Sequence, residues 1–274
     1  MNTKYIFLDI DGTLVSFGKE IPESARKAIY MARANGHKVF ICSGRSRCEM
    51  HDHILSVDMD GIVGSAGAYI EMDGTVVHHH PMTEAMNKRL FEYIQDKKLN
   101  ILVETNDQLL VNQGAMDCID KQIAYCKEHG LAYDKELFDL AEPIESIKEP
   151  CKLAINKILY VDSPYEDDVI RQDLGSEFTV VDSAIQLEGR SGEISELGMN
   201  KGYGMEYVVK HFGATMKDTI AIGDGENDIA MLEVAEIGIA MGNANPVLKE
   251  IADYVTTHVD EDGIWNAFKH YGLI

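Results

Sequence analysis

The sequence lacks the features that would place it among nucleic-acid-binding, membrane or disulfide-stabilised proteins. It has 25 Lys and Arg against 46 Asp and Glu, a formal net charge of -21 and no basic run, so we expect no binding to nucleic acid or to an anionic membrane surface. No apolar run approaches the roughly 20 residues of a membrane span, and no charged-then-apolar leader precedes the first strand. The five cysteines lack the short paired spacings of zinc sites and disulfide frameworks. These absences together predict a soluble protein of the reducing cytoplasm.

What the sequence does contain is an apolar strand that runs directly into two carboxylates. Residues 5–8 are apolar, with a β-branched and aromatic bias, and are followed by Asp9, Asp11 and Gly12. Such a run is typical of a central parallel strand covered on both faces, and ligands bind beyond the carboxyl ends of these strands. Asp9 and Asp11 share one side of the chain, while Gly12 permits a sharp turn with N–H groups open to an anion. The stretch predicts a site for a metal and a phosphate.

The pattern of strands and helices divides the chain into three segments. In residues 1–81 and 188–274 apolar strands alternate with amphipathic helices, which indicates a core of the α/β class with a parallel sheet. Residues 82–187 read as helix, paired strands, helix and paired strands, which predicts a separate inserted α+β domain. Expected core strands are 5–8, 38–42, 61–64, 69–71, 75–77, 218–222 and 237–240, and expected core helices are 22–35, 46–56, 201–211 and 229–235, with a helix through 251 and a last segment at 265–271. In the insertion we expect helices at 83–96, 115–129 and 165–174, strands within 100–112, 153–161 and 178–187, a surface connection at 141–150, and a hairpin turn at 72–74 before it.

Two further strand ends carry polar side chains. The strand 38–42 delivers Ser43-Gly44-Arg45, and the strand 218–222 ends in an acidic, glycine-rich turn that begins Gly223-Asp224. If the crossovers are right-handed, as they usually are, these turns reach the same sheet edge as Asp9.

Four segments resemble, in order and character, the motifs of one family. The stretch Asp9-Ile10-Asp11-Gly12-Thr13-Leu14 resembles the first motif of haloacid dehalogenase (HAD) superfamily phosphatases of the Cof type, which form class IIB. The second motif is matched by Ser43-Gly44-Arg45, the third by Lys201, and the fourth by Gly223-Asp224-Gly225-Glu226-Asn227-Asp228-Ile229-Ala230-Met231-Leu232. The family's tail is matched by Ala240-Met241-Gly242-Asn243-Ala244 and by Asp262-Gly263. The resemblance covers nearly the whole chain and implies a HAD-like Rossmannoid core with a parallel sheet, residues 82–187 taking the position of the C2-type cap. It also implies a Mg²⁺-dependent hydrolase of phosphoric monoesters that acts on small phosphorylated metabolites, sugar phosphates in particular, with the cap closing over the site.

The resemblance assigns a role to each matched residue. Asp9 would attack phosphorus and form an aspartyl-phosphate, and Asp11 would protonate the leaving oxygen and later accept a proton from water. Mg²⁺, held by Asp9, the backbone oxygen of Asp11 and Asp224, would cancel the repulsion between carboxylate and phosphate. The groups expected around the phosphoryl group are the Ser43 hydroxyl, the N–H groups of Ile10 and Gly44, Lys201 and Asn227. Asp228 is expected to orient Lys201 or a metal-bound water, and Thr13 to act as a neighbour of the site or a substrate contact.

Several of these residues have other interpretations. Arg45 fits either a substrate contact or an ion pair with one of the many carboxylates, and a lysine at a helix start, such as Lys201, is commonly just solvated. The run at 78–80 is three histidines on an expected strand, which alternate faces and cannot converge on one metal ion. Cys42 ends a buried strand with no fixed base nearby and is expected in the core. A calcium loop starting at Asp9 is excluded because Leu14 stands where that loop needs glycine.

One departure from the family pattern and two other functions complete the expectations. Ala66, within Ser65-Ala66-Gly67-Ala68, stands where family members often carry asparagine, so an amide expected near the substrate is absent. A phosphotransferase resembling phosphomannomutase shares the core and the style of cap. A non-catalytic metabolite sensor would keep the pocket, but a mere binder has no use for an acid beside a nucleophile.

Overall fold

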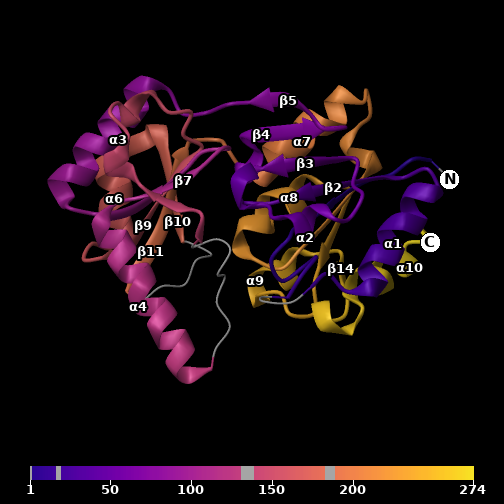
Figure 1. Ribbon diagram of the computed structural model, residues 1–274. Coiled ribbons are helices and arrows are strands. Elements are labelled where there is room, and N and C mark those ends of the chain that lie inside the picture. Colours follow the sequence, from indigo (N-terminus) through magenta and orange to yellow (C-terminus); the bar gives the residue numbers. More distant parts are fainter. Residues whose placement is uncertain (1, 17–19, 131–138, 183–188) are drawn as a thin grey trace. The chain divides into compact units, whose positions relative to one another are not determined.

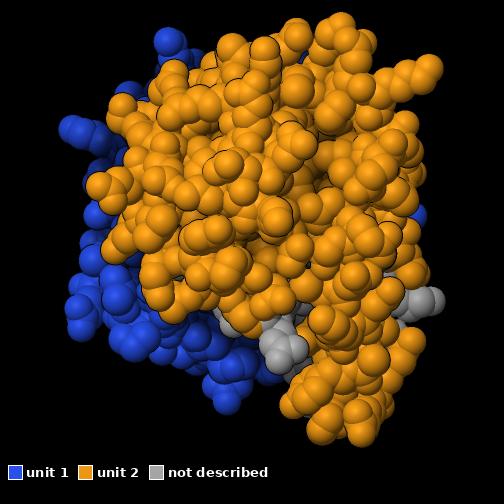
Figure 2. Space-filling view, turned by 90° about the vertical axis from the view of Figure 1, so that its left-hand side faces the viewer, with its two compact units in different colours: residues 1–45, 50–79, 199–274 blue, residues 46–49, 80–198 orange. Residues whose placement is uncertain are grey.

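The computed structural model describes residues 2–16, 20–130, 139–182 and 189–274 (Figure 1). Residues 1–45, 50–79 and 199–274 form one compact unit, the first unit, and residues 46–49 and 80–198 form the second unit (Figure 2). The chain thus passes from one unit to the other at 45/46, 49/50, 79/80 and 198/199. The boundaries expected from the sequence, at 81/82 and 187/188, stay a prediction. Among the described helices none is long and apolar enough to cross a membrane.

The first unit is built on one eight-stranded sheet in the order β14-β13-β12-β1-β2-β3-β4-β5. Its strands are β1 (Tyr5–Leu8), β2 (Lys38–Cys42), β3 (Gly61–Gly64), β4 (Tyr69–Met72), β5 (Thr75–His79), β12 (Thr219–Gly223), β13 (Ile237–Ala240) and β14 (Tyr254–Val255). Neighbours from β14 through β3 are parallel, whereas β4 and β5 add an antiparallel edge. Because β1 lies between β12 and β2, the carboxyl ends of these three strands meet at one edge of the sheet.

Helices cover both faces of this sheet. They are α1 (Glu23–Ala34), α2 (Asp52–Leu55), α7 (Lys201–His211), α8 (Ile229–Val234), α9 (Pro246–Ile251) and α10 (Gly263–His270). In Figure 1, α8 and α9 lie on one side of the strands and α1 and α10 on the other. Ile6, Phe7 and Leu8 of β1 are all fully buried, as the continuous apolar run requires. The predicted α/β fold class is confirmed.

Two local predictions in the first part of the chain had opposite outcomes. The expected hairpin is present, and its turn residues Asp73 and Gly74 have φ values of 48° and 71°, the positive values that a tight two-residue hairpin turn needs at both positions. The helix expected over 46–56 is wrong, because only a 3₁₀ turn, η1 (Arg47–Glu49), and the four-residue α2 form there. Ser46 donates from its N–H and its hydroxyl to the Glu49 carboxylate, at 2.7 and 2.6 Å. These bonds are those of a helix start, and the helix does not continue because the chain is extended at His51, which has a ψ of 166°.

The second unit has a six-stranded sheet in the order β10-β11-β9-β6-β7-β8. Its elements are α3 (Glu84–Lys97), β6 (Asn100–Glu104), β7 (Leu109–Val111), α4 (Gln113–His129), β8 (Ala141–Pro143), β9 (Lys157–Ser163), α6 (Asp167–Leu174), β10 (Phe178–Asp182) and β11 (Arg190–Glu196). Alternate residues of β9 face different cores: Ile158 and Tyr160 pack with α3 and α6, and Leu159 and Val161 pack with α4. The sheet therefore carries helices on both faces, as the period of two dictates.

Three segments of the second unit differ from expectation or extend beyond it. The surface connection expected at 141–150 is wrong in part, because β8 pairs in parallel with β7 there. Pro143 is tolerated because β8 is an edge strand. Of the strand expected over 178–187, β10 covers 178–182, and residues 183–187 lie outside the described residues. The strand β11 was not predicted, because its sequence is polar apart from Ile194.

Candidate active site

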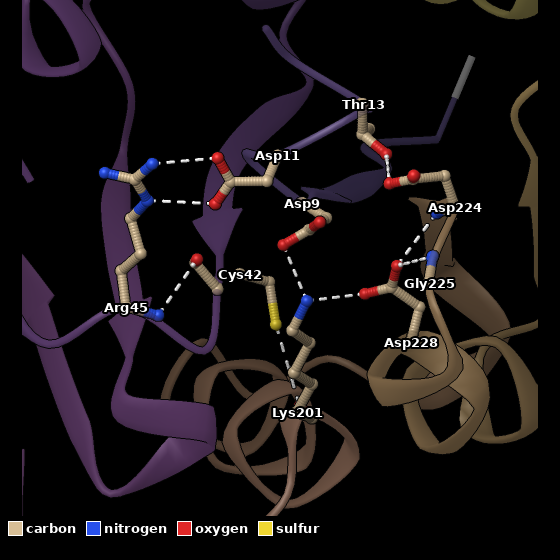
Figure 3. Close-up of polar contacts among 10 residues, drawn as sticks. Asp9, Asp11, Thr13, Cys42, Arg45, Lys201, Asp224, Gly225 and Asp228 are labelled. Carbon is tan, nitrogen blue, oxygen red and sulfur yellow. Dashed lines mark hydrogen bonds and ion pairs between the residues drawn. The ribbon is translucent and has the colours of Figure 1, made fainter. Parts of the chain in front are cut away.

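A buried lysine lies at the centre of the polar residues at the sheet edge. The Lys201 side chain is 1% exposed, and its Nζ donates to Asp9 Oδ1 at 2.6 Å and to Asp228 Oδ1 at 2.5 Å (Figure 3). Burial alone would lower the pKa of Lys201, but Asp228 and Asp9 raise it above its ordinary value. A buried ammonium persists only when paired in this way. Lys201 is therefore not a solvated surface lysine.

Close packing of α7 brings Lys201 to this position. Asn200 caps α7 by accepting the N–H of Tyr203 at 3.0 Å. A Cβ added at Gly67 would lie 2.5 Å from the carbonyl oxygen of Asn200, and one at Gly204 would lie 3.0 Å from the Cα of Gly67. Since real side chains do not tolerate such distances, the two glycines let the start of α7 approach the loop after β3. Lys201, the first residue of α7, is thereby held at the strand ends.

Asp228 is held by protein donors on both oxygens. Its Oδ1 accepts from Lys201, and its Oδ2 accepts the N–H groups of Asp224 and Gly225 at 2.8 and 2.9 Å. The side chain is fully buried and rests on Gly223, where a Cβ would lie 2.4 Å from the Asp228 Cγ. Asp228 therefore fixes both the lysine and the turn that presents Asp224.

Asp224 lies in a slot next to the turn that follows β1. Thr13 Oγ1 donates to Asp224 Oδ1 at 3.1 Å. Gly12 has a φ of +76°, and a Cβ there would lie 2.1 Å from Asp224 Oδ2, so both the turn and the space for this carboxylate depend on glycine. Burial, and then the nearby Asp228, raise the pKa of Asp224 to about 7, although the Thr13 hydrogen bond lowers it.

Three carboxylates gather closely enough to hold one cation. Asp9, Asp224 and Asp228 each place one oxygen so that these oxygens lie within 4.8 Å of one another. The pKa of Asp9 is raised well above its usual range by burial first and by Asp228 second, with Lys201 acting in the opposite direction. Crowded like charges in a buried place favour a cation, and oxygen donors of this kind suit Mg²⁺.

Asp11 and Arg45 form a second set of contacts at the same edge. Arg45 donates from Nε to Asp11 Oδ2 at 2.9 Å and from Nη2 to Asp11 Oδ1 at 2.8 Å (Figure 3). The backbone N–H of Arg45 donates to the hydroxyl of the buried Ser43 at 3.1 Å. Of the two interpretations of Arg45, the structure shows the ion pair, and its partner is the expected acid/base residue.

The other residues singled out in the sequence have less direct connections to this network. Ile10 is fully buried in the turn after β1, and Gly44 is half-buried beside Ser43. Asn227 is exposed on the 3₁₀ turn η7 (Glu226–Asp228). Cys42 is a buried thiol whose pKa burial raises, as expected for a core residue.

The three consecutive histidines have different partners. The His78 ring stacks on Tyr207 with 4.4 Å between ring centroids, and His80 pairs with Glu196 at 3.2 Å. That the three rings share no metal ion stays a prediction from the alternation of strand faces.

One contact of the site was missed in the sequence. Asn243 Nδ2 donates to the carbonyl oxygen of Gly12 at 2.8 Å. The available signal was the match of residues 240–244 to the tail of the family, which carried no role.

Comparison with known proteins agrees with this geometry. A profile of haloacid dehalogenase-like hydrolases matches residues 6–268. This chain belongs to the haloacid dehalogenase-like hydrolase family. It is 31% identical over 280 residues to "Putative phosphatase YkrA" of Bacillus subtilis, with all of both chains covered.

Solved structures of HAD phosphatases have the same fold. The HAD subclass IIB sugar phosphatase BT4131 is 28% identical, with a TM-score of 0.78 over 99% of this chain and 100% of that one. The HAD phosphatase BT1666 from Bacteroides thetaiotaomicron is 27% identical, with a TM-score of 0.79 over 99% and 96%. The resemblance to Cof-type HAD phosphatases, the fold and the phosphatase class predicted from the sequence are confirmed.

Proposed function

We propose that this HAD phosphatase is a Mg²⁺-dependent phosphomonoesterase that acts on small phosphorylated metabolites, sugar phosphates in particular, through an aspartyl-phosphate on Asp9. One observation carries the proposal: the buried Lys201 bridges Asp9 and Asp228, with an oxygen of Asp224 within 4.8 Å of oxygens from both. A structural ion pair needs one carboxylate, whereas three carboxylates around one lysine leave negative charge for a cation to offset. Location in the cytoplasm is part of the proposal and is supported by five cysteines that are all free.

The residues at the sheet edge fit Mg²⁺. Asp9 and Asp224 offer carboxylate oxygens, and the backbone carbonyl of Asp11 would add a third oxygen; Mg²⁺ commonly needs few protein ligands because it keeps several waters. When bound, Mg²⁺ reduces the repulsion between the nucleophilic carboxylate and the phosphate dianion.

In the first step an Asp9 oxygen attacks phosphorus. The bond from phosphorus to the ester oxygen breaks, and Asp11 donates a proton to that oxygen, so that the alcohol leaves and the aspartyl-phosphate remains. Lys201, held in place by Asp228, and the Ser43 hydroxyl would donate to the phosphoryl oxygens as charge spreads over them. Asp11 must lose its bidentate contact with Arg45 before it carries a proton, because a guanidinium stabilises the carboxylate form.

In the second step water attacks the aspartyl-phosphate. The Asp11 carboxylate accepts a proton from this water, the bond between phosphorus and Asp9 breaks, and inorganic phosphate leaves. One residue thus serves as acid and then as base. The choice of substrate is assigned to side chains of the inserted domain, because the groups described above would contact only the phosphoryl group and its immediate oxygen.

The proposal is tested with the purified protein and a panel of phosphorylated metabolites. We expect release of phosphate with Mg²⁺, none with EDTA, and recovery when Mg²⁺ is restored. A ³²P-labelled substrate should leave an acid-stable label on the wild-type protein but not on Asp9→Asn, while the exposed-site control Asp58→Asn should retain both label and turnover. Turnover in EDTA, or undiminished labelling of Asp9→Asn, would disprove the mechanism. A requirement for a sugar bisphosphate activator would instead indicate a phosphotransferase.

A further inference from the structure

The amide of Asn243 joins three parts of the first unit. Asn243 lies in the turn after β13, and its Nδ2 donates to the Gly12 carbonyl at 2.8 Å and contacts Asp224 Oδ2 at 3.4 Å. Its Oδ1 accepts the N–H of Val259 at 3.0 Å. The donor side of the amide therefore faces the turn after β1 and the Asp224 carboxylate, and its acceptor side faces a turn near the end of the chain.

These contacts fix the orientation of the amide. A backbone N–H on one side and a carbonyl oxygen on the other can be satisfied only with Oδ1 toward Val259 and Nδ2 toward Gly12. The turn that carries Val259 is itself fastened, because Gly242 donates to the Thr257 carbonyl at 3.0 Å and Ser16 donates to Asp260 at 2.7 Å. The side-chain amide of Asn243 is thus hydrogen-bonded to the backbone at both its nitrogen and its oxygen.

The Asp224 carboxylate is restrained on each of its oxygens. Thr13 donates to Oδ1 at 3.1 Å, and Asn243 contacts Oδ2 at 3.4 Å. The backbone of Asp224 is also tied to this turn, because its carbonyl accepts the N–H of Asn245 at 3.0 Å. With the slot left by Gly12, little freedom remains for this side chain.

We infer that Asn243 is a positioning residue for Mg²⁺, which acts by holding the Asp224 carboxylate and the turn after β1 in the geometry that binds the cation. This inference rests on the proposed function, in which Asp224 is a Mg²⁺ ligand. Residues that orient metal ligands typically change metal affinity 10- to 100-fold when mutated, although they never touch the ion. A carboxylate restrained before binding loses less freedom when the ion arrives.

Isothermal titration calorimetry of the phosphate-free protein with Mg²⁺ tests this role without measuring catalysis. Asn243→Ala should raise the dissociation constant for Mg²⁺ by about tenfold or more. The matched control is Asn112→Ala in the second unit, since the Asn112 side chain caps α4 by accepting the N–H of Ala115 at 3.0 Å. That variant should lower the melting temperature and leave the dissociation constant within about twofold of wild type.

A double-mutant cycle with Thr13→Val, which removes the hydroxyl that bonds the other oxygen of Asp224, adds a second test. Because both residues act on one carboxylate, the double variant should lose less affinity than the product of the two single effects. Independent effects would overturn the inference, as would an Asn243→Ala variant that loses thermal stability but binds Mg²⁺ as wild type does. If the alanine variant does not fold, Asn243→Ser carries the same expectation. A wild-type protein that does not bind Mg²⁺ would overturn the proposed function together with this inference.

Discussion

Replacing Asp9 by asparagine should stabilise the metal-free protein while it abolishes turnover. Asp9 is 5% exposed, and burial, together with the charge of Asp228, raises its pKa well above the usual range. Asparagine has nearly the same shape and carries no charge. Lys201 would still pair with Asp228 at 2.5 Å, so the substitution leaves no buried ammonium without a partner.

The size of this effect follows from the charges around Asp9. With an effective dielectric constant of about 20, the attraction between Asp9 and Lys201 at 2.6 Å is about 6 kcal/mol. Repulsion from Asp228, which has an oxygen no more than 4.8 Å away, is at least about 3.5 kcal/mol by the same relation, and Asp224, about half ionised at neutral pH with its pKa of about 7, adds about half as much. These attractive and repulsive energies nearly cancel. The desolvation cost of the carboxylate, several kcal/mol for a buried ion, therefore decides whether Asp9→Asn raises or lowers the free energy of unfolding. After the weakened hydrogen bond to Lys201 is subtracted, we expect a gain of about 1 to 3 kcal/mol in the free energy of unfolding.

Urea denaturation in EDTA at neutral pH measures this gain, because EDTA removes any stabilisation of the wild type by bound cations. The native pKa of Asp9 lies above that of the unfolded chain, so the wild-type carboxylate lowers stability as the pH rises through the native pKa. The gain should therefore shrink on acidification and vanish below the pKa of an unfolded aspartate, about 3.9. Asp228→Asn is the contrasting variant and should be destabilising, since an amide cannot satisfy two backbone N–H groups and Lys201 together. An Asp9→Asn variant no more stable than wild type at neutral pH, or equally stabilised at every pH, would refute the reasoning.

Three further predictions concern pH, backbone strain and a buried cluster of the second unit. Because the pKa of Asp224 is raised to about 7, Mg²⁺ affinity should fall as the pH drops below 7, by up to about tenfold per unit, which calorimetry at several pH values would show. Ala66 has left-handed φ and ψ of 51° and 37°, so Ala66→Gly should raise the free energy of unfolding by about 1 kcal/mol in urea, whereas Ala68→Gly, at a φ of -71°, should lower it. Burial, and then Glu49, raise the pKa of Glu104 well above its usual range, so Glu104→Gln should stabilise the protein at neutral pH, with the gain lost toward acidic pH. The contrasting variant for this third prediction is Lys157→Met, which should cost about 3 kcal/mol because it leaves Glu104 and its neighbours without their cation.

Each of these predictions has an outcome that contradicts it. Mg²⁺ affinity that does not change with pH would show that Asp224 is not a ligand of the cation. A destabilised Ala66→Gly would show that the Ala66 side chain contributes more contact energy than its backbone conformation costs. A Glu104→Gln variant destabilised at neutral pH would mean that the carboxylate form is the one that the native state needs.

Much of the fold could be predicted because its strands carry long apolar signals. The core strands are buried on both faces, so their sequences are continuous apolar runs. Because β1 is parallel to β12 and β2, the polar residues that follow these strands lie at one edge of the sheet. The helix expected over 46–56 failed because the chain is extended at His51, with a ψ of 166°, and an apolar pattern does not mark such a break. The strand β11 was missed because its sequence is polar apart from Ile194. Its Gly192 leaves room for Tyr160 of the neighbouring β9, whose hydroxyl would lie 2.2 Å from a Cβ there, and a glycine gives no sign of such a neighbour.

The candidate site was predictable to the extent that its residues follow strands. Asp9 and Asp224 both come directly after apolar runs, whereas Lys201 was singled out by resemblance alone. No local pattern marks a lysine that becomes buried only when a helix packs through glycines onto a loop more than a hundred residues away. Asn243 was missed because its partners are a backbone carbonyl and a backbone N–H, and such partners leave no trace in side-chain chemistry.

The short segment at 46–49 changes how this protein can be re-engineered. These four residues come directly after Arg45 but belong to the second unit, where Glu49 is 3% exposed and Cys48 Sγ contacts the Thr105 carbonyl at 3.4 Å. A chimera that joins a relative's inserted domain at 79/80 and 198/199 would keep Glu49 of this chain, which would then be buried in a domain whose other residues come from the relative. A successful graft must also exchange residues 46–49, so the second unit cannot be replaced without also changing the chain immediately beside Ser43 and Arg45.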